Sequence, residues 1–299
     1  MSNTLAPSVT TRDDKGLKFM SVVDAAYNKA KLSETEAQRV NDTPGLAEVI
    51  AKFIADNRSP NQFKGEETSS NYTYPQEYRG PRQIEEQIKV IAEIFGLDSA
   101  QAFEYAKTLP QLPEGAEGWF AIPSVNALAA KHFSEVTDPA EKYCRAVQLV
   151  IEKLAASRKF YNYRDGQIDP QHLRVHSRTA YALDLITQEQ KGDILIIAAQ
   201  LGMRHRGKSI RRAREVFVPK EFGLEAIAGG SIALTHPERF VRSEELDMDL
   251  SGNEWSWDAD GSFGYALSLD FRGGGVGLGA SEVGSVARYF GSASGFLSQ

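Results

Sequence analysis

The sequence is poor in cysteine and in long apolar runs. Cys144 is the only cysteine among 299 residues, so no disulfide can form within the chain, and its place in a helical pattern indicates a small buried apolar side chain. No apolar run approaches the roughly 20 residues that a membrane-spanning helix requires. The polar residues 1–14 lack the apolar centre of a secretory signal peptide. We therefore expect a cytoplasmic protein with no membrane partner.

Composition and charge set further bounds. Hydrophobic residues make up 41% of the chain and charged residues 25%, as in an ordinary folded protein. The net charge of -6 argues against a general polyanion binder. The charge is uneven, because residues 243–271 hold eight acidic residues and no Lys or Arg, whereas residues 204–214 hold six basic residues and no acid. This asymmetry predicts either separate acidic and basic surfaces or segments that pair inside the fold.

Helical periodicity dominates the first two thirds of the chain. Residues 1–16 are predicted to form a disordered arm, and residues 17–80 a helical segment (17–31 and 46–54) followed by a polar linker. Apolar residues at helical spacing predict helices over 81–95 and 98–108. Asp138-Pro139 and Asp169-Pro170 each have the pattern of a helix start, and the second helix is expected to reach about Gln190. Residues 81–190 are therefore predicted to be a helical domain.

The pattern changes at Gly192. Residues 193–199 form a short Ile-rich run between glycines, which is typical of a buried strand. Residues 263–271 and 276–278, joined by three consecutive glycines, predict a β-hairpin. Residues 191–299 are thus predicted to be a β-containing domain with a basic loop and helix. The predicted fold class is α+β, with a mainly helical amino-terminal two thirds and a smaller β-containing carboxyl-terminal part.

Five stretches of the sequence resemble a family of uncharacterised bacterial proteins. They are GWFAIP at 118–123, KFYNYR at 159–164, RHRG at 204–207, THPER at 235–239 and GSASG at 291–295. The resemblance extends from about Asn71 to the carboxyl terminus and implies that this part of the chain is one unit. It implies no activity, cofactor or catalytic residue.

A phosphate-binding loop is the first candidate site. Residues 202–209, GMRHRGKS, match the pattern G-x-x-x-x-G-K-[ST] between a predicted strand and a helical stretch. In such a loop Lys208 would pair with phosphate and Ser209 would bind magnesium. Two features argue against a nucleotide hydrolase. Residues 204–206 are bulky, and the 90 residues after Ser209 contain glycine-rich strands rather than further strand–helix units.

The same residues also predict a basic surface that binds nucleic acid. On a helix over 208–217 the cations share one face, and those of the preceding loop extend it, which suits a phosphate backbone. A second basic stretch, residues 158–164, alternates cations with aromatic residues, which suits phosphates and stacked bases together. The candidate residues for binding nucleic acid or phosphate are Arg204, Arg206, Gly207, Lys208, Ser209, Arg211, Arg212, Arg158, Lys159, Tyr161, Tyr163 and Arg164.

No metal site is predicted. His172 and His176 have metal-binding spacing on an expected helix, but neighbouring arginines would repel a cation. Residues 258–261 resemble a calcium loop that lacks its first acid and its closing Glu, which favours an acidic turn between strands. His236 and Glu238 are interpreted as part of a capping turn rather than an acid–base pair. Two interpretations stay open for the following acids, a magnesium site or ion pairs with residues 204–214: Asp247, Asp249, Glu254, Asp258 and Asp260.

Three functions are compatible with the sequence. The leading hypothesis is a non-catalytic protein that binds RNA or single-stranded DNA, and it requires the two basic segments to share one surface. The first alternative is an enzyme that acts on a nucleotide or a phosphorylated small molecule through residues 202–209. The second is a structural, self-assembling protein whose basic and acidic segments meet across subunits. The expected partner is nucleic acid or a phosphorylated ligand, and neither a cofactor nor an oligomeric state is indicated.

Overall fold

The chain divides into two compact units, residues 1–59 and 60–299. The computed structural model describes residues 14–43, 45–46, 49–50, 53 and 62–298. In the first unit, α1 (Asp14–Ala30) is followed by α2 (Glu34–Asp42), which begins with a capping box between Ser33 and Glu36. Most of the predicted arm (residues 1–13) and most of the predicted helix 46–54 lie outside the described residues. In the described part of the chain, no helix is long and apolar enough to cross a membrane.

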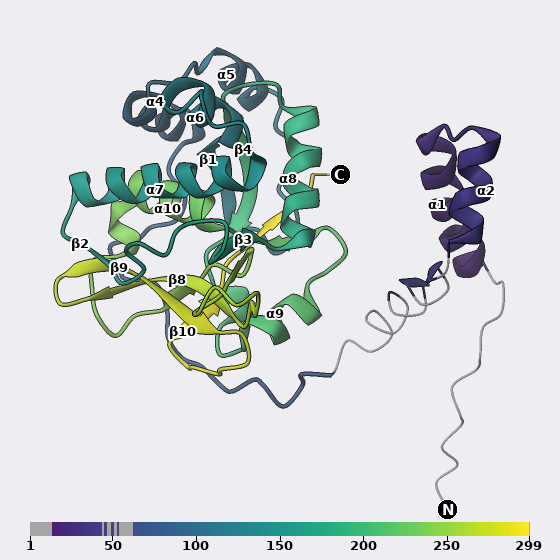
Figure 1. Ribbon diagram of the computed structural model, residues 1–299. Helices are drawn as coiled ribbons and strands as arrows, with labels where there is room; N and C mark the ends of the chain where they lie inside the picture. Colours follow the sequence, from purple (N-terminus) through teal and green to yellow (C-terminus); the bar gives the residue numbers. More distant parts are fainter. Residues whose placement is uncertain (1–13, 44, 47–48, 51–52, 54–61, 299) are drawn as a thin grey trace, which may run out of the picture. The chain divides into compact units, whose positions relative to one another are not determined.

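The second unit contains a four-stranded antiparallel sheet (Figure 1). Its order is β1 (Gly118–Pro123), β4 (Ile194–Gln200), β11 (Ser294–Phe296) and β5 (Glu221–Gly223). The predicted strand at 193–199 is confirmed as β4, and all of its side chains are buried, which explains its unbroken apolar run. β1 pairs with β4 in the register Phe120 to Ile197, so a strand from the predicted helical domain completes this sheet.

A seven-stranded sheet is built on the predicted hairpin, which is confirmed. β8 (Tyr265–Arg272) and β9 (Gly275–Glu282) are joined by Gly273 and Gly274, whose φ angles of 59° and 77° suit a tight hairpin turn. Along its other edge β8 pairs with β6 (Asp247–Asp249) and β7 (Asn253–Trp255). The outer strands are β2 (Phe160–Asn162) on β9, β10 (Phe290–Ser292) on β6 and β3 (Leu173–Val175) on β7.

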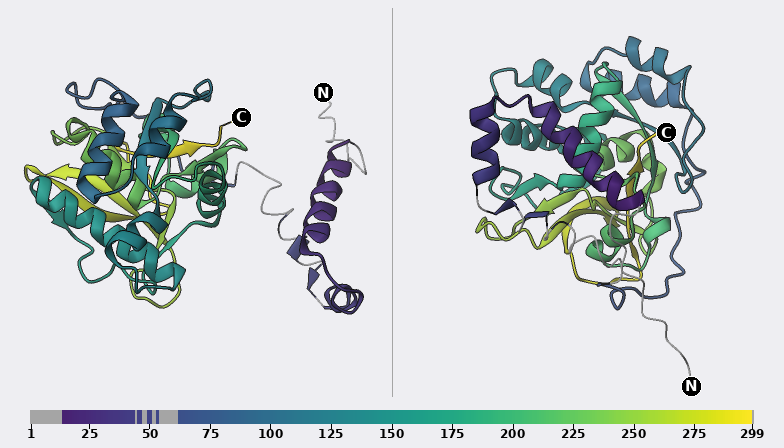
Figure 2. Two further views of the ribbon diagram at one scale, coloured as in Figure 1. Left: turned by 90° about the horizontal axis from the view of Figure 1, so that it is seen from above. Right: turned by 90° about the vertical axis from the view of Figure 1, so that its right-hand side faces the viewer.

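The helices are spread around these two sheets (Figures 1 and 2). α7 begins at Asp138-Pro139 as predicted, because the Asp138 carboxylate accepts a hydrogen bond of 2.9 Å from the N–H of Glu141. Cys144 lies on α7 and is buried, as expected. The helices of this unit, α7 included, are α4 (Ile84–Phe95), α5 (Ala100–Ala106), α6 (Val125–His132), α7 (Pro139–Ser157), α8 (Ser177–Glu189), α9 (Ile210–Val216) and α10 (Ala226–Thr235). Two short 3-10 helices, η1 (Met203–His205) and η2 (Pro237–Arg239), accompany them.

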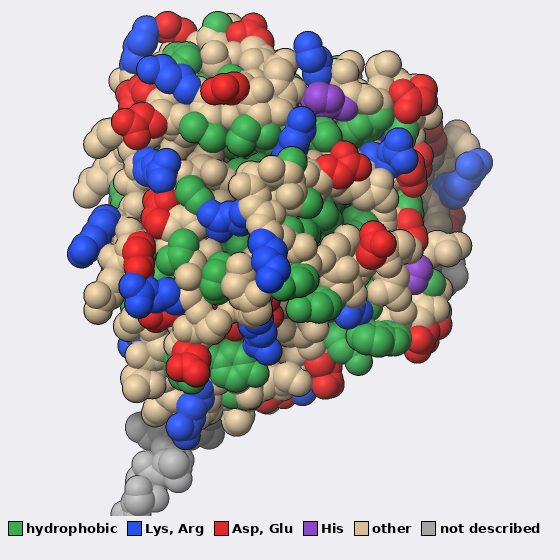
Figure 3. Space-filling model, turned by 90° about the vertical axis from the view of Figure 1, so that its left-hand side faces the viewer, with side chains coloured by type: hydrophobic (Ala, Val, Ile, Leu, Met, Phe, Trp, Pro, Cys, Tyr) green, Lys and Arg blue, Asp and Glu red, His purple; other side chains and the backbone are tan. Residues whose placement is uncertain are grey.

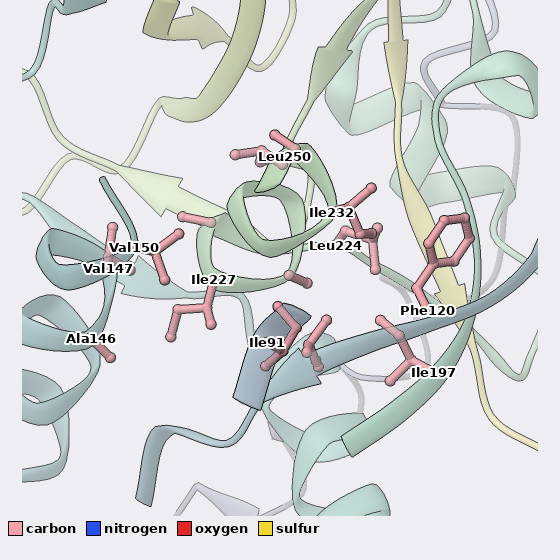
Figure 4. Close-up of a cluster of buried hydrophobic side chains, with 14 of the residues drawn as sticks. Ile91, Phe120, Ala146, Val147, Val150, Ile197, Leu224, Ile227, Ile232 and Leu250 are labelled. Atoms are coloured by element: carbon pink, nitrogen blue, oxygen red, sulfur yellow. The ribbon is translucent and has the colours of Figure 1, made fainter. Parts of the chain in front are cut away.

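Helix α10 is the buried centre of the unit. Every residue of it except Leu234 is buried, and it packs on α7, β1 and the residue that follows β6, Leu250. A Cβ atom on Gly229 would overlap the Leu250 side chain, and one on Gly230 would overlap Val150 of α7. Figure 4 shows Leu250 and Val150 on different sides of this helix. The two glycines therefore let α7 and the strands approach α10 closely.

The predicted division into a helical part and a smaller β-containing part is wrong. Both sheets recruit strands from residues 118–175, and two helices, α9 and α10, lie in the carboxyl-terminal third. Asp169-Pro170 does not begin a helix, because the Asp169 carboxylate accepts from the N–H groups of Gln171 and His172 in a turn that leads into β3. Pairing with strands distant in the sequence decided the conformation of these short segments, because the segments carry little periodicity of their own.

Replacement of Gly291 by alanine should destabilise the second unit. A Cβ atom there would overlap the carbonyl oxygen of Gly202, which itself has a φ of 122°, where β10 meets the loop after β4. We expect a loss of about 2 kcal/mol in the free energy of unfolding, measured by urea denaturation. Gly264→Ala is the control, since an added Cβ there has nothing within 4 Å. Equal midpoints for the two variants would contradict this close approach.

Candidate functional site

The predicted phosphate-binding loop has the expected order of strand, loop and helix. β4 ends at Gln200, whose side chain accepts a hydrogen bond of 2.7 Å from the N–H of Gly202 and so starts the turn. η1 follows, and then Ser209 caps α9 by accepting 3.1 Å from the N–H of Arg212. Local sequence therefore places Ser209 at the amino terminus of a helix, as the motif requires.

A carboxylate of the protein itself occupies that helix terminus. Glu66 accepts hydrogen bonds from the Ser209 hydroxyl (2.7 Å) and from Nε of Arg211 (2.8 Å). The hydrogen bond from Arg211 holds the pKa of Glu66 below its ordinary value. Glu66 belongs to residues 62–73, which we call the covering segment, and Thr68 of this segment donates to the carbonyl of Gly207 at 2.8 Å. A negative group thus already lies where the motif would hold phosphate.

Most other cations of the first basic segment also have partners inside the molecule. Arg212 lies between Glu67 (3.2 Å) and Glu215 (2.8 Å). Arg206 donates to the carbonyl of Tyr72, and Arg204 lies 3.4 Å from Glu221. The side chain of Lys208 forms no ion pair with any described residue. The basic segment therefore pairs inside the fold, but mainly with glutamates that lie outside the acidic residues 243–271.

A buried polar network lies beneath this loop, and the sequence did not indicate it. Nε2 of His205 lies 2.7 Å from Glu221, and the Ser294 hydroxyl donates to the same carboxylate oxygen at 2.6 Å. Burial lowers the pKa of His205, although the Glu221 carboxylate opposes this effect. Because Ser294 donates to the carboxylate and not to the imidazole, the arrangement does not activate a nucleophile. It joins η1, β5 and β11.

The second basic segment lies on β2, the edge strand of the seven-stranded sheet. The rings of Tyr161 and Tyr163 are stacked, with centroids 6.1 Å apart and an interplanar angle of 16°, and Tyr163 is 54% exposed. Lys159 donates to the carbonyl of Gly273 at 2.9 Å and lies 5.2 Å from the Tyr161 ring centroid. Arg164 stacks on Trp255 and Trp257, each 4.8 Å away, and Arg158 donates to the carbonyl of Phe240.

The two basic segments contact different parts of that sheet: Arg211 of the first donates its N–H to the carbonyl of Val283, directly after β9, whereas β2 pairs with the start of β9. Arg206 forms a bridge to Gly291 of β10, whereas Tyr161 is on β2, and the strand order between them is β10, β6, β8, β9, β2. Four strand spacings amount to about 19 Å. The structure therefore does not bring the predicted binding residues onto one continuous surface.

Aspartates occupy the sheet between the two basic segments. The cross-strand register places Tyr161, Gly277, Asp270 and Asp247 in one row, so their side chains share a face. Burial, reinforced by the charge of Asp270, raises the pKa of Asp247 to about 7. Arg272 lies 3.0 Å from Asp270 and 3.5 Å from Asp247, so one cation serves both carboxylates. We call Asp247, Asp249 and Asp270 the aspartate cluster.

The magnesium interpretation of the acids finds no support in the geometry. Among the described residues no group of three or more His, Cys, Asp or Glu side chains could hold a metal ion. Asp247 pairs with Arg272 and Glu254 pairs with Arg174 at 2.7 Å, so neither forms an ion pair with residues 204–214. Of the cations in residues 204–214, Arg214 reaches the acidic segment, where it donates to the carbonyls of Ser251 and Asn253 and its charge acts on Asp249 and Glu254. Asp260 accepts from the N–H of Ser262 in an acidic turn between β7 and β8, as predicted.

The histidines have structural positions. His172 lies 2.9 Å from Asp169, whereas His176 caps α8, so the expected shared helix is absent and the two do not form a metal site. Burial lowers the pKa of His236 to about 4, and its Nε2 accepts 3.0 Å from the N–H of Arg82. Glu238 pairs with the Arg82 side chain at 2.7 Å rather than with His236. His236 and Glu238 are therefore not an acid–base pair.

Comparison with known proteins adds no relative. No model of a known protein family, no curated protein and no solved structure matches this chain.

Figure 3 shows the face that carries β2 and the β8–β9 hairpin, and basic and acidic side chains are interspersed over it. Any anion that binds there would meet local groups of cations rather than a broad field of one sign.

Removal of the Glu66 carboxylate should loosen the covering segment. We expect Glu66→Ala to speed tryptic cleavage after Lys64 about tenfold or more, because hydrogen bonds to charged groups each stabilise by about 1.5–3 kcal/mol. The cleavage rate would be followed by mass spectrometry of the intact protein and its fragments. Glu77→Ala, which removes an exposed ion pair with Arg242 elsewhere, is the control. Equal cleavage in both variants would refute this role of Glu66.

Neutralisation of Asp249 should change the pH dependence of stability. Burial raises the pKa of Asp249 to about 7, against a hydrogen bond from Ser281 and the charge of Arg214. The folded state therefore keeps a proton that the unfolded chain releases near pH 4, and this carboxyl lowers the free energy of unfolding as the pH rises towards 7. We therefore expect the free energy of unfolding of Asp249→Asn, taken relative to wild type, to be about 2 kcal/mol larger at pH 8 than at pH 5.

Urea denaturation at both pH values measures this gain. The difference between the two proteins isolates Asp249, because His236 and His176, with pKa values of about 4, act in the opposite direction in both. Asp258→Asn, on an exposed turn, serves as the control. A stability difference that stays constant from pH 5 to pH 8 would show that Asp249 is ionised throughout.

Proposed function

We propose that this protein binds short single strands of RNA or DNA along the edge strand β2, without catalysis. The stacked pair Tyr161 and Tyr163 carries the proposal. Aromatic rings on a sheet accept unpaired bases by stacking, and this contact is worth about 1–3 kcal/mol per base whatever the base is. Exposure of Tyr163 leaves a ring face open to a base.

The cations beside the tyrosines favour a nucleic acid over an uncharged ligand. Lys159 precedes the tyrosines on the chain, and Arg272, with its side chain 54% exposed, lies across β9 from them. Both lie beside Gly275, on the hairpin side of the tyrosines, where they can approach the phosphates of a stacked strand. The neighbouring Asp270 repels phosphate but accepts hydrogen bonds from the amino groups of bases. A strand is thus expected to run along the sheet edge with its phosphates turned away from the aspartate cluster.

The alternative of an enzyme with a phosphate loop at residues 202–209 has weaker support. Glu66 would have to leave the amino terminus of α9 before an anion could bind there. Nucleotide binding that appears only in Glu66→Ala would favour this alternative. The self-assembly hypothesis has no specific contact in its favour among the described residues, since the arginines of residues 204–214 find their partners within the chain.

The proposal predicts that Tyr163→Ala weakens binding of labelled oligouridine or oligothymidine about tenfold or more. Fluorescence anisotropy over a salt series would measure the affinity. Tyr181→Ala is the matched control, because Tyr181 is 65% exposed on α8, away from β2. Arg211→Ala should leave the affinity almost unchanged, because that cation is held by Glu66 beyond the carboxyl end of β9, away from the residues of β9 that pair with β2.

Two results would overturn the proposal. The first is an absence of binding at low salt by the wild-type protein. The second is binding that Tyr163→Ala leaves intact while Arg211→Ala abolishes it, which would place the nucleic acid on the first basic segment.

A further inference from the structure

A cavity of about 350 Å³ lies between α7 and α8, apart from the β2 edge. Its wall is mainly apolar and includes Ile122 from β1, Leu195 from β4 and Ile227 from α10. This volume is at the lower end of the range for ligand pockets, about 300–1,000 Å³, so the cavity suits a small molecule.

Among the described residues, three charged side chains line the cavity, and one of them serves the fold. The Glu225 carboxylate caps α10 by accepting from the N–H groups of Ile227 (2.7 Å) and Ala228 (2.8 Å). It also accepts from the hydroxyl of Tyr143 at 2.8 Å. Because each of its oxygens already accepts from a donor of the protein, Glu225 is held in place by the fold rather than left without a partner.

The other two charged side chains, Lys142 and Asp184, have no such partners. Lys142 lies in the first turn of α7 and is partly buried, and Asp184 lies on α8 and is exposed. Neither forms an ion pair or a side-chain hydrogen bond with any residue that the structure describes. The rim of an apolar cavity therefore carries one cation and one anion, supplied by different helices.

We infer that this cavity binds a small zwitterion, an α-amino acid with an apolar side chain. The ligand's ammonium group would meet Asp184, its carboxylate would meet Lys142, and its side chain would contact Ile122, Leu195 and Ile227. A fatty acid would satisfy only the lysine and an alkylamine only the aspartate, and each would leave the other charge without a partner at the rim.

Calorimetric titration of the full-length protein with L-leucine and L-phenylalanine tests this inference. Isocaproate and isoamylamine, which are leucine without its ammonium group and without its carboxylate, are the comparison ligands. We expect saturable binding of at least one amino acid at micromolar to millimolar concentration. Each comparison ligand should bind the protein at least about tenfold more weakly than leucine does, because it lacks one of the two charged groups.

Variants assign the two charges separately. Asp184→Asn should weaken amino-acid binding about tenfold and leave isocaproate binding unchanged, whereas Lys142→Met should weaken amino-acid binding and leave isoamylamine binding unchanged. Ala180→Phe should fill the cavity and abolish all binding. Arg145→Met, at an exposed position on α7, is the control. Thermal unfolding of each variant would establish that it is folded.

Three outcomes would overturn the inference. These are no saturable binding of either amino acid at millimolar concentration, equal affinities for leucine and isocaproate, and amino-acid binding that survives in folded Ala180→Phe. The last outcome would place the ligand elsewhere on the molecule.

Discussion

Close packing around α10 is the constraint on which the rest of the second unit depends. Gly229 and Gly230 present no side chains, so Leu250 and Val150 come into contact with the helix backbone. Leu250 follows directly after β6, and its inward position fixes which face of that strand turns to the core. Met248 is buried on the same side, and Asp247 and Asp249 must then face away from α10. The aspartate cluster is therefore a consequence of how the core packs.

The distribution of charge follows from that arrangement. The aspartate cluster lies across the middle of the seven-stranded sheet, between Arg206 beside β10 and the tyrosines of β2. Glu66 and Glu67 pair with Arg211 and Arg212, while Asp270 and Asp247 pair with Arg272 on the face that the tyrosines of β2 share. Cations of the described residues thus lie in local groups beside carboxylates rather than over one broad basic surface, in keeping with the net charge of -6.

Sequence patterns succeeded where the signal was local and failed where it was not. The Ile-rich run of β4, the glycine turn of the β8–β9 hairpin and the Asp138-Pro139 start of α7 were all predicted, because each depends on neighbouring residues. β1 and α10 were missed. A six-residue strand and an apolar helix with two central glycines carry no periodicity, and only their partners define them. Glu66 was also missed, since it lies 143 residues from Ser209 in the sequence.

The sequence by itself determined that the chain has a helical stretch and loop after a buried strand near residues 193–217, a hairpin near residue 273, and two segments in which cations are concentrated. These features follow from residue type and short-range spacing. Only the tertiary structure decided which charges are free. It placed a glutamate on the loop that resembles a phosphate-binding loop, separated the two basic segments on the sheet, and left Lys142 and Asp184 beside an apolar cavity. The physical reason is that ion pairing depends on distance in space, which strand order and helix packing fix and local sequence does not.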